Sequence, residues 1–195
     1  SMQQEVQQVP YNDAPDALRR RFALLQHRAT RDAGPMPEET TPELLHDPAL
    51  NARSFYSSVN GEIASYAAVV RKTIAHGEQV FDMAGLSCVA TDPDFRARGL
   101  GLRTVAAATR WIEQSPIDLG VFTCDPPLAY FYARAGAWSV VNDVVLIGSR
   151  DDGALRSDLL GKAVLMRLFS AKARAAAPTL SHTVIDLDLP VGHFL

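Results

Sequence analysis

The sequence of 195 residues has few cysteines, little net charge and no long apolar run. Cys88 and Cys124 form neither a CxxC pair nor another metal-ligand spacing, which predicts free thiols in a reducing, cytoplasmic compartment. A net charge of −3 without a basic stripe gives no indication of a nucleic-acid partner. No apolar run approaches about 18 residues, so no membrane span is expected. The polar start of the chain lacks the apolar segment of a signal peptide.

The residues that are present are typical of a soluble globular protein. Apolar residues make up 47% and charged residues 21% of the chain, enough for a core within a single domain, residues 1–195. The five histidines include no i, i+4 pair, so no metal is expected. Apolar residues at helical spacing predict a helix over residues 15–33. The Pro-rich, acidic stretch that follows predicts a loop with one short helix at 42–46.

The first half of the chain then predicts an antiparallel meander of three strands. Residues 53–59 and 63–75 have strand character and are joined by Asn60-Gly61, a strong hairpin signal. A second turn at residues 76–79 leads into a strand over residues 80–91. Each strand therefore pairs with the one before it.

The second half alternates between helices and strands, which predicts the class α/β (α+β) with one parallel pair of strands in an otherwise antiparallel sheet. Asp125 is expected to cap a helix that Gly136 ends. The expected elements are a helix at 102–114, a strand at 117–124, a helix at 125–136, a strand at 137–148, a strand and short helix from 162, and one extended piece in the tail.

One stretch, "DPDFRARGLGLRT" at residues 92–104, carries chemistry. It joins an apolar strand to the start of a helix, where free N–H groups and partial positive charge favour anions. Glycines allow the backbone to approach a ligand closely. Arg96, Arg98 and Arg103 add positive charge with bidentate reach to phosphate oxygens. The segment is therefore a candidate diphosphate site.

Two known phosphate loops do not match this stretch. A P-loop needs Gly-Lys-Ser/Thr at its end, and the second glycine here is followed by leucine and Arg103. A dinucleotide fingerprint needs a third small residue where Thr104 stands. A third pattern, Arg/Gln-x-x-Gly-x-Gly/Ala, is matched at every specified position by residues 96–101.

With this match, "VATDPDFRARGLG" resembles the acyl-CoA loop of the GCN5-related N-acetyltransferase (GNAT) superfamily, and "YFYARAGAW" resembles the family's next helix and turn. The resemblance covers about residues 50–147. A looser similarity is to aminoglycoside 2′-N-acetyltransferases and nodulation-type acyltransferases. The resemblance implies a mixed, mostly antiparallel sheet with helices on both faces. In the family's strand order the fourth and fifth strands, here 80–91 and 117–124, splay apart. Residues 150–195 are an elaborated end, expected to shape an acceptor pocket or a homodimer contact.

The resemblance also implies a reaction. Acetyl-CoA is the acyl donor, no metal takes part, and a neutral primary amine of a small molecule or peptide attacks the thioester. A main-chain N–H near Val89 would stabilise the oxyanion, and Tyr132 stands where the family places a general acid. The resemblance implies that the strand backbone at Val89, Ala90 and Thr91 binds CoA. It also implies CoA binding by the loop amides of Arg96, Ala97, Arg98, Gly99, Leu100 and Gly101.

The sequence says less about the acceptor side of the site than about the CoA side. Ser87 and Cys88 occupy the place of a Glu-containing substrate contact in the aminoglycoside enzymes, so weak or no transfer to aminoglycosides is expected. The general base stays open between Asp82, Asp125, a water chain and a carboxylate of the tail, Asp186 or Asp188.

The sequence also allows three competing interpretations. A non-catalytic acyl-CoA-binding module on the same scaffold is the alternative from another class, and an intact loop together with Tyr132 argues against it. "GLSCV" at 85–89 lacks the last glycine of a serine-hydrolase elbow. Cys124 precedes a helix N-terminus, which lowers a thiol pKa, but a buried or pocket-wall cysteine is the favoured interpretation.

Overall fold

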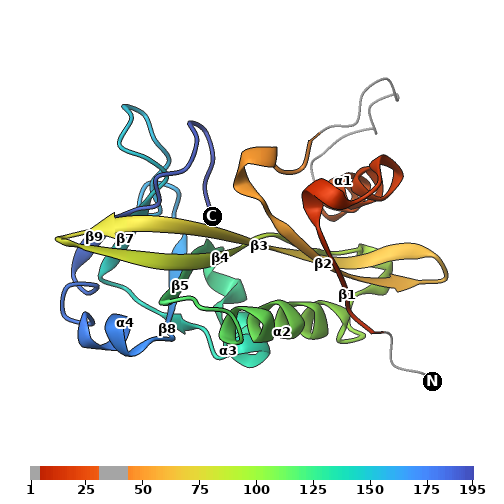
Figure 1. Cartoon of the computed structure of the whole chain (residues 1–195). Coiled ribbons are helices and arrows are strands. Elements are labelled where there is room, and N and C mark those ends of the chain that lie inside the picture. Colours follow the sequence, from red (N-terminus) through yellow and green to blue (C-terminus); the bar gives the residue numbers. More distant parts are fainter. Residues whose placement is uncertain (1–4, 31–43) are drawn as a thin grey trace. The chain divides into compact units, whose positions relative to one another are not determined.

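The computed structural model describes residues 5–30 and 44–195 (Figure 1). These form two compact units, one of residues 5–30, 44–70 and 87–108 and one of residues 71–86 and 109–195. A seven-stranded sheet has the strand order β1-β2-β3-β4-β5-β8-β6, and β7 and β9 form a second sheet. In the large sheet β1 with β2, β2 with β3, β5 with β8 and β6 with β8 are antiparallel, and β4 with β5 is parallel, as the sequence predicts.

The first unit holds the N-terminal elements and the candidate phosphate loop. Its elements, in chain order, are β1 (Gln7–Pro10), η1 (Tyr11–Asp13), α1 (Asp16–Ala29), η2 (Pro48–Leu50), β2 (Arg53–Val59), the first part of β3 (Glu62–His76), the end of β4 (Gln79–Thr91), η3 (Pro93–Phe95) and the first turns of α2 (Leu100–Glu113). The helix predicted at 42–46 lies partly outside the described residues, and residues 44–46 are not helical. A short 3-10 turn, η2, follows instead.

Packing in the first unit confirms the hairpin and the helix. Asn60 and Gly61 both have positive φ, 51° and 80°, which is the twist that two-residue hairpins require. The predicted helix forms over α1, which ends at Ala29 rather than at residue 33. Its fully buried Phe22 lies 5.1 Å from the ring of Tyr56 and 4.7 Å from that of Tyr66. These contacts fix α1 on β2 and β3.

The second unit holds the C-terminal elements. They are the ends of β3 and α2, the start of β4, β5 (Leu119–Cys124), η4 (Pro126–Leu128), α3 (Ala129–Gly136), β6 (Ser139–Val140), β7 (Val144–Ile147), β8 (Ala163–Leu168), α4 (Ala171–Ala175) and β9 (Thr183–Asp186). The single strand predicted over 137–148 is wrong. A turn at residues 142 and 143 separates β6, which pairs with β8, from β7, which pairs with β9. The strand and short helix predicted from 162 are confirmed as β8 and α4.

The pairing of β4 with β5 stops early. The parallel register joins Met83 to Leu119 and Ala84 to Gly120, although β5 continues to Cys124 and pairs with β8 over its whole length. One edge of β5 is thus fully paired and the other is paired only at its start. This is the divergence of the two strands that the family resemblance implies, and it begins at Gly85.

No helix among residues 5–30 and 44–195 is long and apolar enough to cross a membrane.

Candidate functional site

The last five residues of β4 differ from the rest of the strand. Residues 83–86 are buried, whereas residues 87–91 are all half-buried. Cys88 has a φ of 54° in the middle of this strand, a conformation that is costly for a residue with a Cβ. Its carbonyl oxygen accepts a hydrogen bond of 2.7 Å from Nε2 of Gln26. The strand is therefore kinked at Cys88, directly before Val89, whose N–H is the predicted oxyanion donor.

Asp92 fixes the exit from the strand. Its buried carboxylate accepts from the backbone N–H of Asp94 at 2.9 Å and from Nε of Arg28 at 2.8 Å. Its own N–H donates to the carbonyl of Ala64 at 2.8 Å. Arg28 lies two residues from Gln26 on α1, so the last turns of α1 hold the strand backbone on both sides of residues 89–91. Sequence reasoning overlooked this role for Asp92, although an aspartate before proline is a common turn signal.

The 96–101 loop is exposed over its first four residues and buried at Leu100. Ala97 and Gly99 have positive φ, 65° and 76°. The carbonyl of Gly99 accepts from the N–H of Arg103 at 3.0 Å, so Gly99 stands at the N-cap of α2. The N–H groups of the next residues therefore have no acceptor within the helix. Alternating left-handed residues before a helix N-terminus form a concave set of amides that suits an anion.

Arg103 lies against this loop. Its Nη1 is 3.1 Å from the position a Cβ on Gly99 would take, so glycine at this position leaves space for the guanidinium. The Nε atom of Arg103 is buried and has no hydrogen-bond partner among the described residues. A buried, unpartnered donor of a cation is expensive unless a ligand satisfies it. Arg98, by contrast, is exposed and its guanidinium lies 5.4 Å from the ring centre of Phe95.

The first turns of α2 are anchored by hydroxyl groups. Thr104 Oγ1 lies 2.5 Å from Ser65 Oγ and 3.1 Å from Ser57 Oγ, and it donates to the Leu100 carbonyl at 2.8 Å. Thr104 and both serines are buried. Val105, Ala108, Thr109 and Ile112 form a buried face of α2, whereas Leu102 is only half-buried.

Tyr132 belongs to the second unit. It is buried on α3, and its ring lies 5.1 Å from that of Phe122 in an edge-to-face contact. Burial raises the pKa of Tyr132 above its ordinary value, and the charges of Cys124 and Asp125 add to this. A phenol that stays protonated at neutral pH can donate a proton but cannot act as a base. Tyr130 on the same helix is 74% exposed, and Leu128, which precedes the helix, is 47% exposed.

The N-cap predicted at Asp125 is wrong in detail. Asp125 precedes a 3-10 turn, η4, and its side chain makes no capping bond. Oδ1 of Asp125 instead accepts from Lys162 Nζ at 2.6 Å. Cys124 is buried, and burial raises its thiol pKa, with Asp125 adding to the effect. A reactive thiolate at this helix start is therefore disfavoured. Burial likewise raises the pKa of the Cys88 thiol, which keeps that predicted acceptor contact uncharged.

The carboxylates considered as general bases all have partners in the second unit. Asp82 accepts from Thr73 Oγ1 at 3.2 Å, and Asp125 is held by Lys162. Asp186 pairs with Arg150 at 2.8 Å and Asp188 with Lys72 at 3.7 Å. The contacts favour none of them as a free base, which leaves a water chain as the simplest route for the proton.

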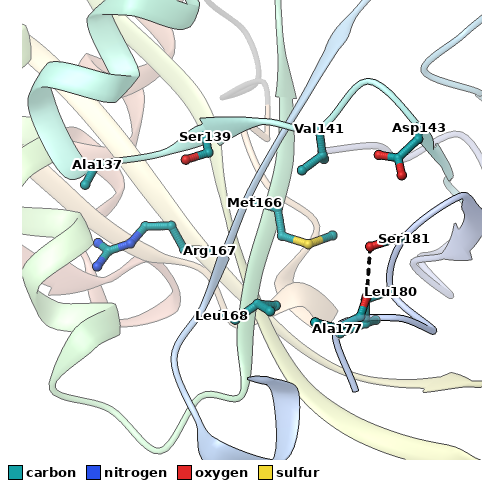
Figure 2. Close-up of a pocket in the computed structure, with 10 residues that line it drawn as sticks. All are labelled: Ala137, Ser139, Val141, Asp143, Met166, Arg167, Leu168, Ala177, Leu180 and Ser181. Atoms are coloured by element: carbon teal, nitrogen blue, oxygen red, sulfur yellow. Dashed lines mark hydrogen bonds between the residues drawn. The ribbon is translucent and has the colours of Figure 1, made fainter. Parts of the chain in front are cut away.

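A surface pocket of about 380 Å³ in the second unit is lined by β6, β8 and the segment after α4 (Figure 2). Arg167 and Asp143 line it together with apolar side chains. Arg167 donates to the Gly136 carbonyl at 2.8 Å, and Asp143 accepts from the His182 N–H at 2.9 Å. Both charged groups are thus engaged within the protein, and none of the predicted site residues lines this pocket.

No family model matches the sequence, and no curated protein matches it. Solved structures do match the fold. An acyl-CoA N-acyltransferase from Pseudomonas aeruginosa has a TM-score of 0.54 at 13% identity, with 85% of this chain and 99% of that chain covered. A suggested acetyltransferase of the GNAT family from Desulfovibrio desulfuricans has a TM-score of 0.51 at 18% identity, with 85% and 100% covered.

A conserved protein from Enterococcus faecalis V583, with a suggested role in N-acyl transfer, has a TM-score of 0.52 at 13% identity, and 72% of this chain is covered. This chain spans only 33% of that protein's length. At these identities the likeness establishes the fold, which is the one the sequence predicts.

Proposed function

We propose that this protein is an acetyl-CoA-dependent N-acetyltransferase that transfers an acetyl group to a primary amine of a small molecule or peptide. The observation that carries the proposal is the 96–101 loop, with its two left-handed residues, its helix N-terminus and the unpartnered Nε of Arg103. These groups match the charge and hydrogen-bonding capacity of a diphosphate. The shared fold with N-acyltransferases supports the same conclusion.

In this proposal the donor is held by main-chain groups. Val89, Ala90 and Thr91 would pair with the pantetheine arm as an added strand, and the amides of residues 96–101 would bind the diphosphate. The kink at Cys88 turns the backbone just before Val89, which supports that N–H as the donor to the developing oxyanion. Because main-chain groups make these contacts, side chains at positions 89–91 are free to vary.

The chemical step follows from the charges. The amine must lose a proton before it attacks the thioester carbonyl, and water is the simplest acceptor for that proton. The C–N bond forms as the amine attacks and gives the tetrahedral intermediate, the nitrogen releases its extra proton to water, and the C–S bond breaks as that intermediate collapses. Tyr132, whose pKa is raised by burial, would donate its proton to the departing thiolate and recover one from solvent.

For the acceptor we propose a chemical class and not a single compound. Ser87 and Cys88 offer only neutral groups, since burial raises the Cys88 pKa. A polycationic aminoglycoside gains no charge complementarity from such groups. We therefore propose an acceptor with a single primary amine, and we expect weak or no transfer to kanamycin or gentamicin.

Two measurements test the function. Calorimetry with CoA should detect binding, and silence at millimolar ligand would remove the basis of the proposal. Thiol release from acetyl-CoA over a panel of amines, including aminoglycosides, should then detect turnover. Binding of CoA without turnover on any amine would favour the non-catalytic alternative.

A further inference from the structure

The end of the described chain lies on the half-paired edge of β5. The carbonyl oxygen of Leu195 accepts two hydrogen bonds from Thr123, one from its N–H at 3.2 Å and one from Oγ1 at 2.6 Å. Thr123 is the register partner of Val164 in β8. The Val164 carbonyl is engaged on its other side by the N–H of Val141 at 2.9 Å. The Thr123 N–H therefore points away from β8, toward the edge that β4 leaves at Gly85.

The Leu195 side chain lies where the two strands diverge. A Cβ placed on Gly85 would come 2.8 Å from Cδ1 of Leu195 and 2.7 Å from the carbonyl oxygen of Val121. Glycine is therefore required at this point, because a Cβ would clash with the β5 backbone as well as with Leu195. Leu195 is 8% exposed, whereas residues 193 and 194 before it are half-buried. The buried leucine lies at the point where the pairing of β4 with β5 ends, here called the fork.

The opposite face of β5 carries the proposed acid. Successive side chains of a strand alternate between faces, and Phe122, next to Thr123, packs on Tyr132. If Tyr132 protonates the thiolate, the sulfur lies within hydrogen-bond reach of its hydroxyl. The acyl group then extends away from Tyr132, past the edge of β5 and toward the fork that Leu195 closes.

We propose that Leu195, held by Thr123 on the free edge of β5, closes the narrow end of the fork and restricts the donor to short-chain acyl thioesters. This inference rests on the proposed function, because it assigns the acyl side of the same site. Leu195 is buried, whereas an acceptor approaches from solvent. The residue therefore controls the length of the acyl group rather than the choice of acceptor.

The test is calorimetric binding of acetyl-CoA and butyryl-CoA to the full chain, which needs no acceptor. An accessible apolar slot gains about fourfold in affinity for each methylene it takes up. The wild-type protein should gain nothing from the two extra methylenes. Leu195→Ala removes three carbons from the fork and should favour butyryl-CoA over acetyl-CoA by about 15-fold relative to wild type.

The matched control is Leu189→Ala, another buried leucine of the tail, whose N–H bonds to the Gly148 carbonyl. It should destabilise the tail without changing the affinity ratio. If Leu195→Ala does not fold, Leu195→Val should shift the same ratio in the same direction by a smaller factor. An unchanged ratio in a folded Leu195 variant overturns the inference, as does a wild-type protein that already binds butyryl-CoA about 15-fold more tightly than acetyl-CoA. Absence of binding by either thioester to wild type would instead count against the proposed function.

Discussion

The replacement of Arg103 by methionine separates ligand binding from stability. Methionine keeps an unbranched apolar stem but removes the guanidinium whose Nε is buried without a partner. In the free protein such an unsatisfied donor costs about 1–3 kcal/mol. Arg103→Met should therefore leave the stability unchanged or raise it, by about 2–4 °C in Tm for each kcal/mol relieved in a chain of this size.

The same substitution should weaken CoA binding. A hydrogen bond to a charged partner contributes about 1.5–3 kcal/mol, which corresponds to a loss of about 10-fold to 150-fold in Kd. The loss should be confined to ligands that carry the diphosphate. Pantetheine, which lacks it, should bind the variant and the wild type equally.

The assay is calorimetry with CoA and pantetheine, combined with thermal unfolding of the free protein. Arg110→Met is the matched control, because Arg110 is exposed near the other end of the same helix and should change neither quantity. A fall in Tm of several degrees would show that Arg103 stabilises the fold. An equal loss for pantetheine would show that it does not act through the diphosphate. Either result would refute the reasoning.

Three further predictions concern buried polar groups. Tyr132→Phe should lower kcat by about 10²-fold to 10⁴-fold and leave the CoA Kd unchanged; an unchanged kcat would remove Tyr132 as the acid. Burial raises the pKa of both Tyr132 and Tyr66, so above about pH 10 the unfolded chain ionises while the folded one does not. Each tyrosine then lowers the free energy of unfolding by about 1.4 kcal/mol per pH unit, and a Tm that stays flat between pH 10 and 11 would contradict this. Thr104→Val should cost about 1–3 kcal/mol in urea unfolding, because Ser57 and Ser65 lose a buried partner.

Local signals in the sequence were sufficient where one short stretch determines its own backbone. Asn60-Gly61 adopts the positive φ values of its turn, and helical spacing identifies the buried face of α2. The glycine and arginine spacing likewise locates a loop with left-handed residues at a helix start. In each case the conformation depends on residues within a few positions of one another, which is the range a pattern can report.

Sequence patterns failed where contacts with residues distant in sequence determine the backbone conformation. Gly136 was expected to take the left-handed position that ends α3, but Ala137 takes it, with a φ of 56°. Gly136 is required for packing, because a Cβ there would lie 2.5 Å from Thr109 Oγ1 and 2.7 Å from Trp138 Nε1. No spacing rule predicts that contact. The break between β6 and β7 did have a local signal, the turn-forming pair Asn142-Asp143, which the apolar residues on either side obscured.

In the first unit, the conformation of the candidate donor site depends both on its local sequence and on contacts with residues distant in sequence. The 96–101 loop is largely exposed, and few of its own contacts could hold two left-handed residues in place. Its fixed points lie outside it, at Asp92, which Arg28 and the Asp94 N–H bind, and at Thr104, which Ser57 and Ser65 surround. Both anchors are buried, so the loop amides are positioned before any ligand arrives. Preorganisation of this kind reduces the ordering cost of binding, so it would favour the proposed binding of a flexible diphosphate by an exposed loop.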